Sequence, residues 1–118
     1  MRVFICDDNR DYRTLIKLVL TDPFEIVGEA ADGLEAIEQA PGADPDVLLL
    51  DLNMPKMGGF EALPHLRAQL PGTKILVLTT GQAPKERQQA LESGADGFIV
   101  KPDRVFALDD EIKAALAA

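Results

Sequence analysis

Five short apolar segments, separated by longer mixed ones, most constrain the fold of this 118-residue chain. They are rich in Val, Ile and Leu, and most are continuously apolar instead of alternating between apolar and polar residues. Continuous apolar runs are typical of strands that are covered on both faces, as in a parallel sheet. The predicted strands are Arg2–Cys6, Glu25–Ala30, Asp46–Leu50, Lys74–Leu78 and Gly97–Val100.

The segments between these strands carry helical patterns. Pro64 lies inside one of them, so we expect either a kink or a helix that effectively starts later. The segment Pro84–Ser93 carries little apolar weight, and we expect it to be weakly held and free to shift. Two short helices are predicted at 33–40 and 59–70. Two further segments have apolar residues at helical spacing along one face. These residues are Tyr12, Leu15, Ile16 and Val19 in the first segment and Val105, Leu108, Ile112 and Leu116 in the second.

Strand and helix alternate five times, which predicts an α/β fold with a parallel sheet. Right-handed crossovers and the chain length favour an open, doubly wound sheet. We therefore expect one domain with the flavodoxin-like (βα)5 arrangement, its five strands in the order 2-1-3-4-5. Ligands of such sheets bind outside the carboxyl ends of the strands.

The charge is distributed unevenly along the chain. Residues 1–51 contain 12 acidic and 4 basic residues, whereas residues 52–118 contain 8 of each. This distribution argues against direct binding of nucleic acid or of an anionic membrane. It fits a site that holds a cation, a surface for a basic partner, or a solvated acidic face. A single cysteine, Cys6, and the lack of a long apolar run favour the reducing cytoplasm.

Reactive or ionic side chains follow four of the five predicted strands. Asp7 and Asp8 follow the first strand, Asp51 follows the third, Thr79 follows the fourth and Lys101 follows the fifth. In the expected order these four strands are neighbours, so their carboxyl ends lie along one edge of the sheet. Each residue alone has a simple structural explanation, such as a helix cap for Asp8. Their joint occurrence is what predicts a site.

Such a cluster suits one particular chemistry. Three neighbouring carboxylates repel one another and stay ionised only when a cation lies among them, and oxygen ligands suit Mg²⁺. Three aspartates, one Mg²⁺ and the Lys101 ammonium sum to zero charge, so the site can accept an anionic phosphoryl group. A carboxylate can attack phosphorus to form an aspartyl phosphate, with the metal and the lysine stabilising the transferred charge.

The order and spacing of these motifs resemble a response-regulator receiver domain, the phospho-acceptor module of two-component signalling. The resemblance spans almost the whole chain and implies that residues 1–118 form one receiver domain. It implies a protein that catalyses its own Mg²⁺-dependent phosphorylation and dephosphorylation without being a conventional enzyme. Residues 27–33 and 78–80 are most similar to receivers of the LuxR/NarL class. The matching segments are CDDN at 6–9, LDLNMPKMGG at 50–59, LTT at 78–80 and GADGFIVKP at 94–102.

The resemblance also implies roles for the acidic residues. Asp51 receives the phosphoryl group from a phosphohistidine of a sensor histidine kinase. Asp8 and Asp51 ligate Mg²⁺, Asp7 acts largely through water, and the backbone carbonyl of Asn53 supplies a further ligand.

The remaining motif residues belong to the switch that the resemblance implies. Thr79 binds a phosphoryl oxygen after transfer, Lys101 pairs with the phosphoryl group, and Phe98 turns inward when Thr79 moves. The bond between Lys101 and Pro102 matches one that is usually cis in the family. Two departures stand out: Phe98 lacks the hydroxyl that many receivers carry there, and Gly81 offers no side chain to orient or block an attacking water.

The same resemblance implies how phosphorylation would be passed on to a downstream partner. The loop after Thr79, the helix from Pro84, the last strand and the last helix are expected to form the surface that switches. We expect this surface to control transcription through a C-terminal helix-turn-helix domain or to act on a separate effector. The chain is then either a stand-alone regulator or the receiver of a longer transcription factor. A dimer linked to phosphorylation is left open.

Two other functions remain open. A receiver-like interaction module that needs no phosphate would keep the fold but lose one of the acids, the threonine or the lysine. A phosphohydrolase of the haloacid dehalogenase type would need DxD on the first strand, whereas here the acceptor lies on the third and Asn53 replaces the second acid.

Cys6 is expected to be a buried small residue, and His65 to lie on the surface.

Overall fold

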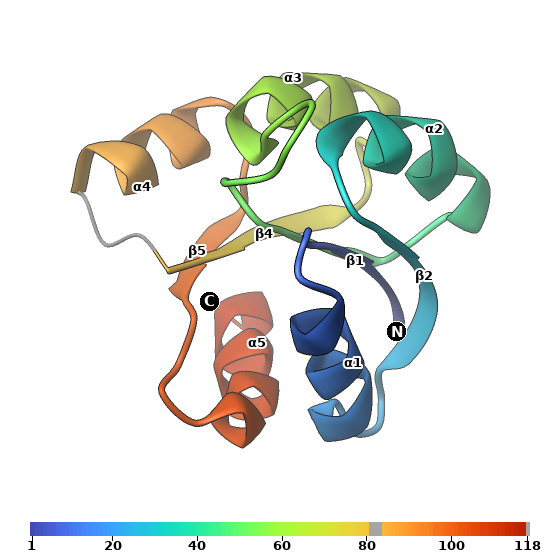
Figure 1. Ribbon diagram of the computed structural model, residues 1–118, viewed down its shortest axis with the longest axis vertical. Helices are drawn as coiled ribbons and strands as arrows, with labels where there is room; N and C mark the ends of the chain where they lie inside the picture. The colour runs from blue at the N-terminus through green and yellow to red at the C-terminus, as the bar shows by residue number, and fades with distance from the viewer. Residues whose placement is uncertain (81–83, 118) are drawn as a thin grey trace.

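The computed structural model describes residues 1–80 and 84–117, which form one five-stranded parallel sheet flanked by helices (Figure 1). The strand order is β2-β1-β3-β4-β5, so the predicted flavodoxin-like topology is confirmed. The strands are β1 (Arg2–Cys6), β2 (Glu25–Ala30), β3 (Val47–Leu50), β4 (Lys74–Thr79) and β5 (Gly97–Val100). The helices are α1 (Arg10–Val19), α2 (Gly33–Ala43), α3 (Gly59–Gln69), α4 (Pro84–Glu92), the 3₁₀ turn η1 (Val105–Ala107) and α5 (Leu108–Ala117).

Helices cover both faces of the sheet. In Figure 1, α1 and α5 lie on one face, and α2, α3 and α4 lie on the other. Successive strand residues point to opposite faces, so Phe4 and Leu48 join one core cluster while Ile5 and Leu49 join the other. Both clusters exclude water almost completely, which explains why the strand sequences are continuously apolar.

Two prolines lie inside helices. We expected Pro41 to lie beyond its helix, but α2 continues to Ala43, so that boundary was wrong. A proline costs its helix a backbone hydrogen bond, and here the end is closed by Asp44, whose N–H donates to the Pro41 carbonyl at 3.3 Å. The helix α3 begins at Gly59, as predicted, and continues through Pro64, so of the two alternatives expected for Pro64 the later start does not occur.

The predicted apolar stripes are only partly buried. In α1 the Ile16 side chain is fully buried, but Leu15 is 40% exposed because it lies at the edge of the stripe. The C-terminal stripe is divided between η1 and α5, and Leu108 and Ile112 form its buried part. Among the nine residues of α4, Ala90 alone is buried and Leu91 is 42% exposed. The helix α4 therefore buries little apolar surface against the rest of the fold.

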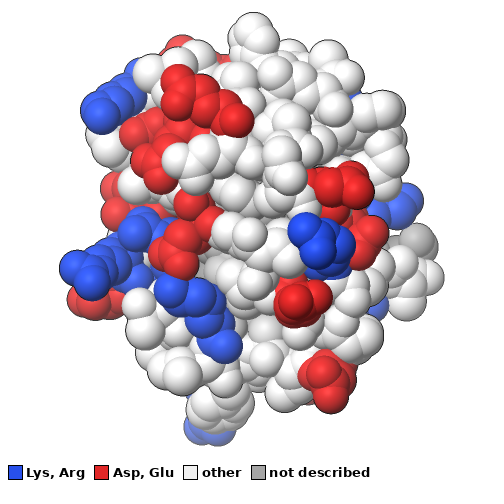
Figure 2. Space-filling view, turned by 90° about the vertical axis from the view of Figure 1, so that its right-hand side faces the viewer, with Lys and Arg blue, Asp and Glu red and all other residues white. Residues whose placement is uncertain are grey.

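Part of the acidic excess in the first half of the chain is paired. The Glu29 carboxylate accepts hydrogen bonds from Lys17 Nζ at 2.6 Å and from Arg13 Nε at 2.8 Å, and these bonds lower the pKa of Glu29. On the face that Figure 2 shows, acidic and basic side chains are interspersed with wide uncharged areas.

Of the helices described, none is long and apolar enough to cross a lipid bilayer.

Arg67 of α3 ties together the segments that lead into β4 and β5. Its guanidinium donates to the Asp96 carboxylate at 2.9 Å and to the backbone carbonyls of Gly94, Leu70 and Thr73. Asp96 in turn accepts the backbone N–H of Ile75 at 2.8 Å. Gly94 has φ of 115°, and a Cβ there would lie 2.7 Å from the Arg67 side chain, so only glycine fits.

We predict that Arg67→Ala lowers the free energy of unfolding by about 2–4 kcal/mol, because several partly buried acceptors lose a charged donor. Urea-induced unfolding followed by circular dichroism measures the effect. The matched control is Arg87→Ala on the exposed face of α4, which should change stability by less than about 0.5 kcal/mol. Equal stability of the two variants would show that the Arg67 contacts do not hold the sheet.

Candidate functional site

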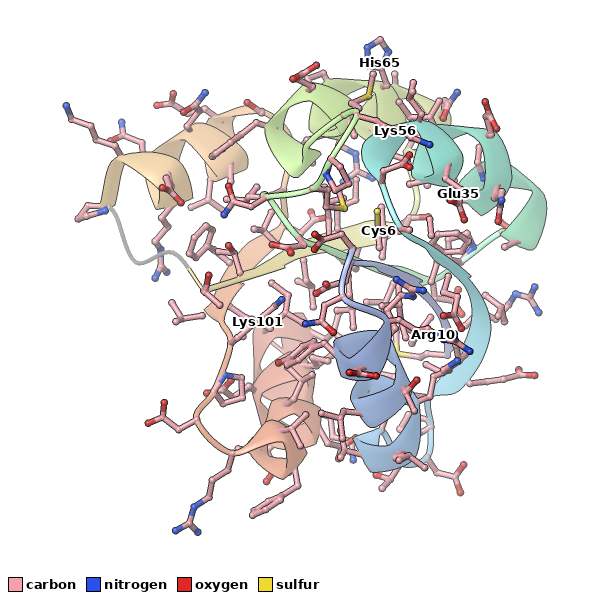
Figure 3. The ribbon with its side chains drawn as sticks, viewed as in Figure 1. Cys6, Arg10, Glu35, Lys56, His65 and Lys101 are labelled. Carbon is pink, nitrogen blue, oxygen red and sulfur yellow. The ribbon has the colours of Figure 1, made fainter. Side chains whose placement is uncertain are left out.

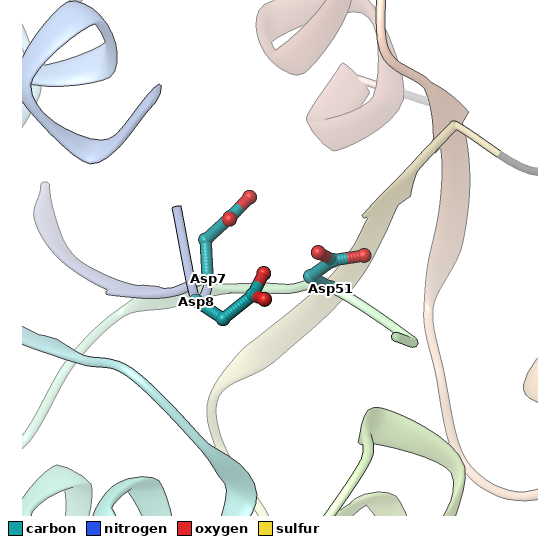
Figure 4. A group of neighbouring side chains, drawn as sticks. All are labelled: Asp7, Asp8 and Asp51. Carbon is teal, nitrogen blue, oxygen red and sulfur yellow. The ribbon is translucent and has the colours of Figure 1, made fainter. Parts of the chain in front are cut away.

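Three carboxylates meet at the carboxyl end of the sheet. Asp7 and Asp8 follow β1 and Asp51 follows the adjacent β3, to which β1 is joined by the hydrogen bond from the Asp51 N–H to the Cys6 carbonyl at 2.9 Å. One oxygen from each of the three carboxylates lies within 4.8 Å of the others (Figure 4). Asp7 and Asp51 are buried, whereas Asp8 is exposed. The structure thus brings together the three acids that the sequence singles out.

Lys101 enters the same cluster from the end of β5. Figure 3 labels Lys101, which lies at the end of β5. Its Nζ lies 2.7 Å from Asp7 Oδ2 and 3.6 Å from Asp51 Oδ2, and its side chain is only 13% exposed. The one cis peptide bond in residues 1–80 and 84–117 precedes Pro23, so the expected cis bond between Lys101 and Pro102 was wrong. The trans form is the intrinsically favoured one, and with it the lysine stem still reaches both carboxylates.

The other predicted site residues surround this cluster. Thr79 is the last residue of β4, is fully buried, and accepts the Lys101 backbone N–H at 2.8 Å. Asn53 is exposed, and its backbone N–H lies 3.4 Å from Asp51 Oδ1. Phe98 is half-buried and packs on the core cluster that faces α2 and α3. Gly81 lies outside the described residues.

The N-terminus of α1 orients Asp7. The Asn9 backbone N–H donates to Asp7 Oδ1 at 2.9 Å, while the Asn9 side chain caps α1 through the Tyr12 N–H at 3.0 Å. Arg13 Nη1 donates to the Asp7 carbonyl at 2.6 Å. Sequence reasoning did not identify these contacts of Asn9 and Arg13. An asparagine before a predicted helix was the only available signal.

The loop after Asp51 is packed tightly against the neighbouring loops. A Cβ at Gly59 would lie 2.2 Å from the Asp51 carbonyl, so α3 can start this close to Asp51 only with glycine. The Gly59 N–H donates to the Leu52 carbonyl at 3.0 Å, and the Met57 carbonyl accepts the Gly33 N–H at 2.8 Å. These contacts hold the backbone on which Asp51 and Asn53 lie.

Burial and like charges govern the ionisation of the site. Burial raises the pKa of Asp51 above its usual range, and Lys101 opposes this shift while Asp7 adds to it. Burial also raises the pKa of the Cys6 thiol, which packs against Met54 Sδ at 3.4 Å. Cys6 is therefore a buried small residue, as expected, and His65 lies exposed on α3, also as expected.

Tyr12 is a part of the site that the sequence did not reveal. Its ring centroid lies 4.3 Å from Lys101 Nζ. Burial, together with the charges of Asp7, Glu111 and Asp51, raises the pKa of Tyr12 to about 12. The sequence placed Tyr12 only in the apolar stripe of its helix, and nothing in the sequence pairs it with Lys101.

The residues of the cluster fit a divalent cation. Their donors are carboxylate oxygens, which suit Mg²⁺ better than they suit softer ions. The three carboxylates and the Lys101 ammonium together have a net charge of −2. One monovalent cation would leave the cluster with a charge of −1. A single divalent ion would make the cluster neutral.

Comparisons with known proteins show the family of this chain. The model of the family "Response regulator receiver domain" matches residues 3–113. The chemotaxis protein CheY of Halobacterium salinarum is 33% identical over 117 residues, which cover 99% of this chain and 98% of that protein. The nitrate/nitrite response regulator NarL of Escherichia coli K12 is 38% identical over 101 residues, or 84% of this chain but 47% of that protein.

Solved structures give the same result. The receiver domain of the putative NarL from Mycobacterium tuberculosis has a TM-score of 0.87 and 31% identity, covering 99% of this chain and 97% of that one. CheY in the CheX–CheY–BeF₃–Mg²⁺ complex from Borrelia burgdorferi has a TM-score of 0.86 and 25% identity, covering 98% and 89%. This chain belongs to the response regulator receiver domain family. It is a CheY-like or NarL-like receiver domain of two-component signalling.

We predict that Asp8→Asn stabilises the protein by about 1 kcal/mol in the presence of EDTA, because it removes one of three mutually repelling charges. The same variant should gain less stability than the wild type when Mg²⁺ is added, because a ligand is lost. Thermal unfolding with and without Mg²⁺ measures both effects. Glu38→Gln, an exposed change on α2, is the control. An Asp8→Asn protein less stable than the wild type in EDTA would contradict the repulsion.

Proposed function

We propose that residues 1–118 act as one receiver domain, which accepts a phosphoryl group on Asp51 in a Mg²⁺-dependent reaction and then switches a surface that controls an output. One observation carries the proposal: the Asp7, Asp8 and Asp51 carboxylates lie within 4.8 Å of one another, with the Lys101 ammonium against two of them. No simple structural role requires three acids and a buried lysine at one edge of a sheet.

The metal ligands in this proposal are Asp7, Asp8, Asp51 and the backbone carbonyl of Asn53, with Asp7 acting largely through water. When bound, Mg²⁺ would neutralise charge on the acids and on the oxygens of the incoming phosphoryl group. The oxygen-rich donor set and the net charge of the cluster support this choice of ion.

The reaction is a phosphoryl transfer to a carboxylate. An Asp51 oxygen attacks phosphorus, the P–N bond of the kinase phosphohistidine breaks, and the imidazole nitrogen keeps the electron pair of that bond. Lys101 offers its ammonium to a phosphoryl oxygen and thereby offsets the charge that Asp51 acquires. Two features prepare these groups for their roles: the hydrogen bonds that orient Asp7, and the short distance of 3.6 Å between Lys101 Nζ and Asp51.

The switch in this proposal runs through β4 and β5. Thr79 binds a phosphoryl oxygen, Phe98 changes its side-chain position, and the surface of α4, β5 and α5 changes with them. The weak anchoring of α4, in which Ala90 alone among nine residues is buried, supports movement in this region. Phe98 carries no hydroxyl, so its position is set by packing alone.

A sensor histidine kinase is the proposed phosphodonor. The output is a C-terminal helix-turn-helix domain or a separate effector: this chain spans about half of the NarL relative and 98% of the CheY relative from Halobacterium salinarum. In this proposal the chain binds neither nucleic acid nor a membrane directly. The proposal does not require a dimer that forms on phosphorylation. The single buried cysteine, Cys6, supports a cytoplasmic location.

A receiver-like interaction module that needs no phosphate is the alternative. The presence of all three acids, Thr79 and Lys101 at the end of the sheet weighs against it. Under this alternative Asp51→Asn would leave partner binding and output unchanged.

The proposal predicts a covalent adduct on Asp51. Wild-type protein incubated with acetyl phosphate and Mg²⁺ should gain one phosphoryl group by intact-mass spectrometry, and EDTA should abolish the gain. Asp51→Asn should show no adduct because it lacks the nucleophile. The control Asp11→Asn changes an exposed acid on α1 outside the cluster and should behave like the wild type. An unmodified wild type, or an equal adduct on Asp51→Asn, would refute the proposed function.

A further inference from the structure

The Lys101 ammonium is held between a carboxylate and an aromatic ring. Its Nζ lies 2.7 Å from Asp7 Oδ2 and 4.3 Å from the centroid of the Tyr12 ring. Only 13% of the lysine side chain is exposed. The ammonium has therefore exchanged most of its water for these two neighbours.

The ring is a suitable neighbour for a cation that has lost its water. The face of an aromatic ring is electronegative and attracts an ammonium within about 6 Å of the centroid, more strongly when water is excluded. Tyr12 lies in the first turns of α1, whose N-terminus Asn9 caps, and it packs against the core cluster that faces α1 and α5. A well-anchored helix thus presents the ring to the flexible end of Lys101.

The Tyr12 hydroxyl does not anchor the ring. It is buried, and within residues 1–80 and 84–117 it has no hydrogen-bond partner. A buried hydroxyl without a partner costs stability. The contact of Tyr12 with the site is therefore made by the face of the ring, and a phenylalanine could make the same contact.

We propose that Tyr12 is a positioning residue for Lys101, a role that rests on the proposed function of Asp51. The ring keeps the ammonium in the pocket while it changes partner, from Asp7 before transfer to the phosphoryl group on Asp51 afterwards. Attraction to a ring face has little directional demand, so Nζ can pivot over Tyr12. The two carboxylates already lie 2.7 and 3.6 Å from Nζ, so the change needs only a small movement.

The contact itself can be tested without metal or phosphate. In wild-type protein the ring current of Tyr12 should shift the ε-methylene protons of Lys101 upfield in NMR spectra. Tyr12→Phe should keep this shift and Tyr12→Leu should lose it. An unchanged shift in Tyr12→Leu would overturn the inference, since Lys101 would then lie elsewhere.

The role can be tested by a double-mutant cycle on phosphorylation by acetyl phosphate and Mg²⁺. Tyr12→Leu should slow the reaction by about 3- to 10-fold, whereas Tyr12→Phe should stay within about 2-fold of the wild type. In a Lys101→Ala background Tyr12→Leu should have no further effect, because the residue acts through the lysine. An equal loss in both backgrounds would show a merely structural role and overturn the inference.

Controls separate this inference from the proposed function and from loss of folding. Val19→Ala, a half-buried change at the far end of α1, should lower stability but leave the phosphorylation rate unchanged. Failure of wild-type protein to form the adduct would overturn both proposals together. A normal adduct on wild-type protein with a full rate for Tyr12→Leu would overturn the role of Tyr12 alone.

Discussion

The ion pair between Lys101 and Asp7 joins the ends of the first and last strands, β1 and β5, and holds the site together. Asp7 follows β1, Lys101 follows β5, and β3 and β4 lie between these two strands. The Lys101 Nζ that pairs with Asp7 also lies 3.6 Å from Asp51 Oδ2. Removing either partner would leave a buried charge without compensation, which is among the costliest single changes in a protein. The folded arrangement of β1, β3, β4 and β5 is therefore needed to satisfy these few groups.

The molecule divides into a firmly packed site and a lightly held surface. Around Asp7 and Asp51 the backbone is held by helix caps, short contacts between loops and a glycine that allows α3 to start against Asp51. Around α4 there is little buried apolar surface to oppose movement. A signalling domain needs both parts, since chemistry requires fixed groups and a switch requires an element with a small difference in free energy between two positions.

Sequence patterns predicted the sheet closely and the helix ends less well. Continuous apolar runs located the strands to within a residue, because burial on both faces leaves little freedom of composition. Pro41 was wrongly placed beyond its helix, and the effect of Pro64 was left open, because the cost of a proline depends on which carbonyl loses its partner and on how the turn is closed. The trans bond before Pro102 was likewise missed, since a family tendency does not determine an isomer.

The strand pattern and the polar residues that follow the strands were sufficient, without coordinates, to predict the topology and the gathering of Asp7, Asp8, Asp51 and Lys101. The reason is that a parallel sheet brings the carboxyl ends of neighbouring strands to one edge whatever the intervening helices contain. The contacts of Arg13 with Asp7 and of Tyr12 with Lys101 were decided by the tertiary structure. They depend on the angle at which α1 packs on the sheet and on the rotamers that packing selects, and no local pattern along the chain encodes either.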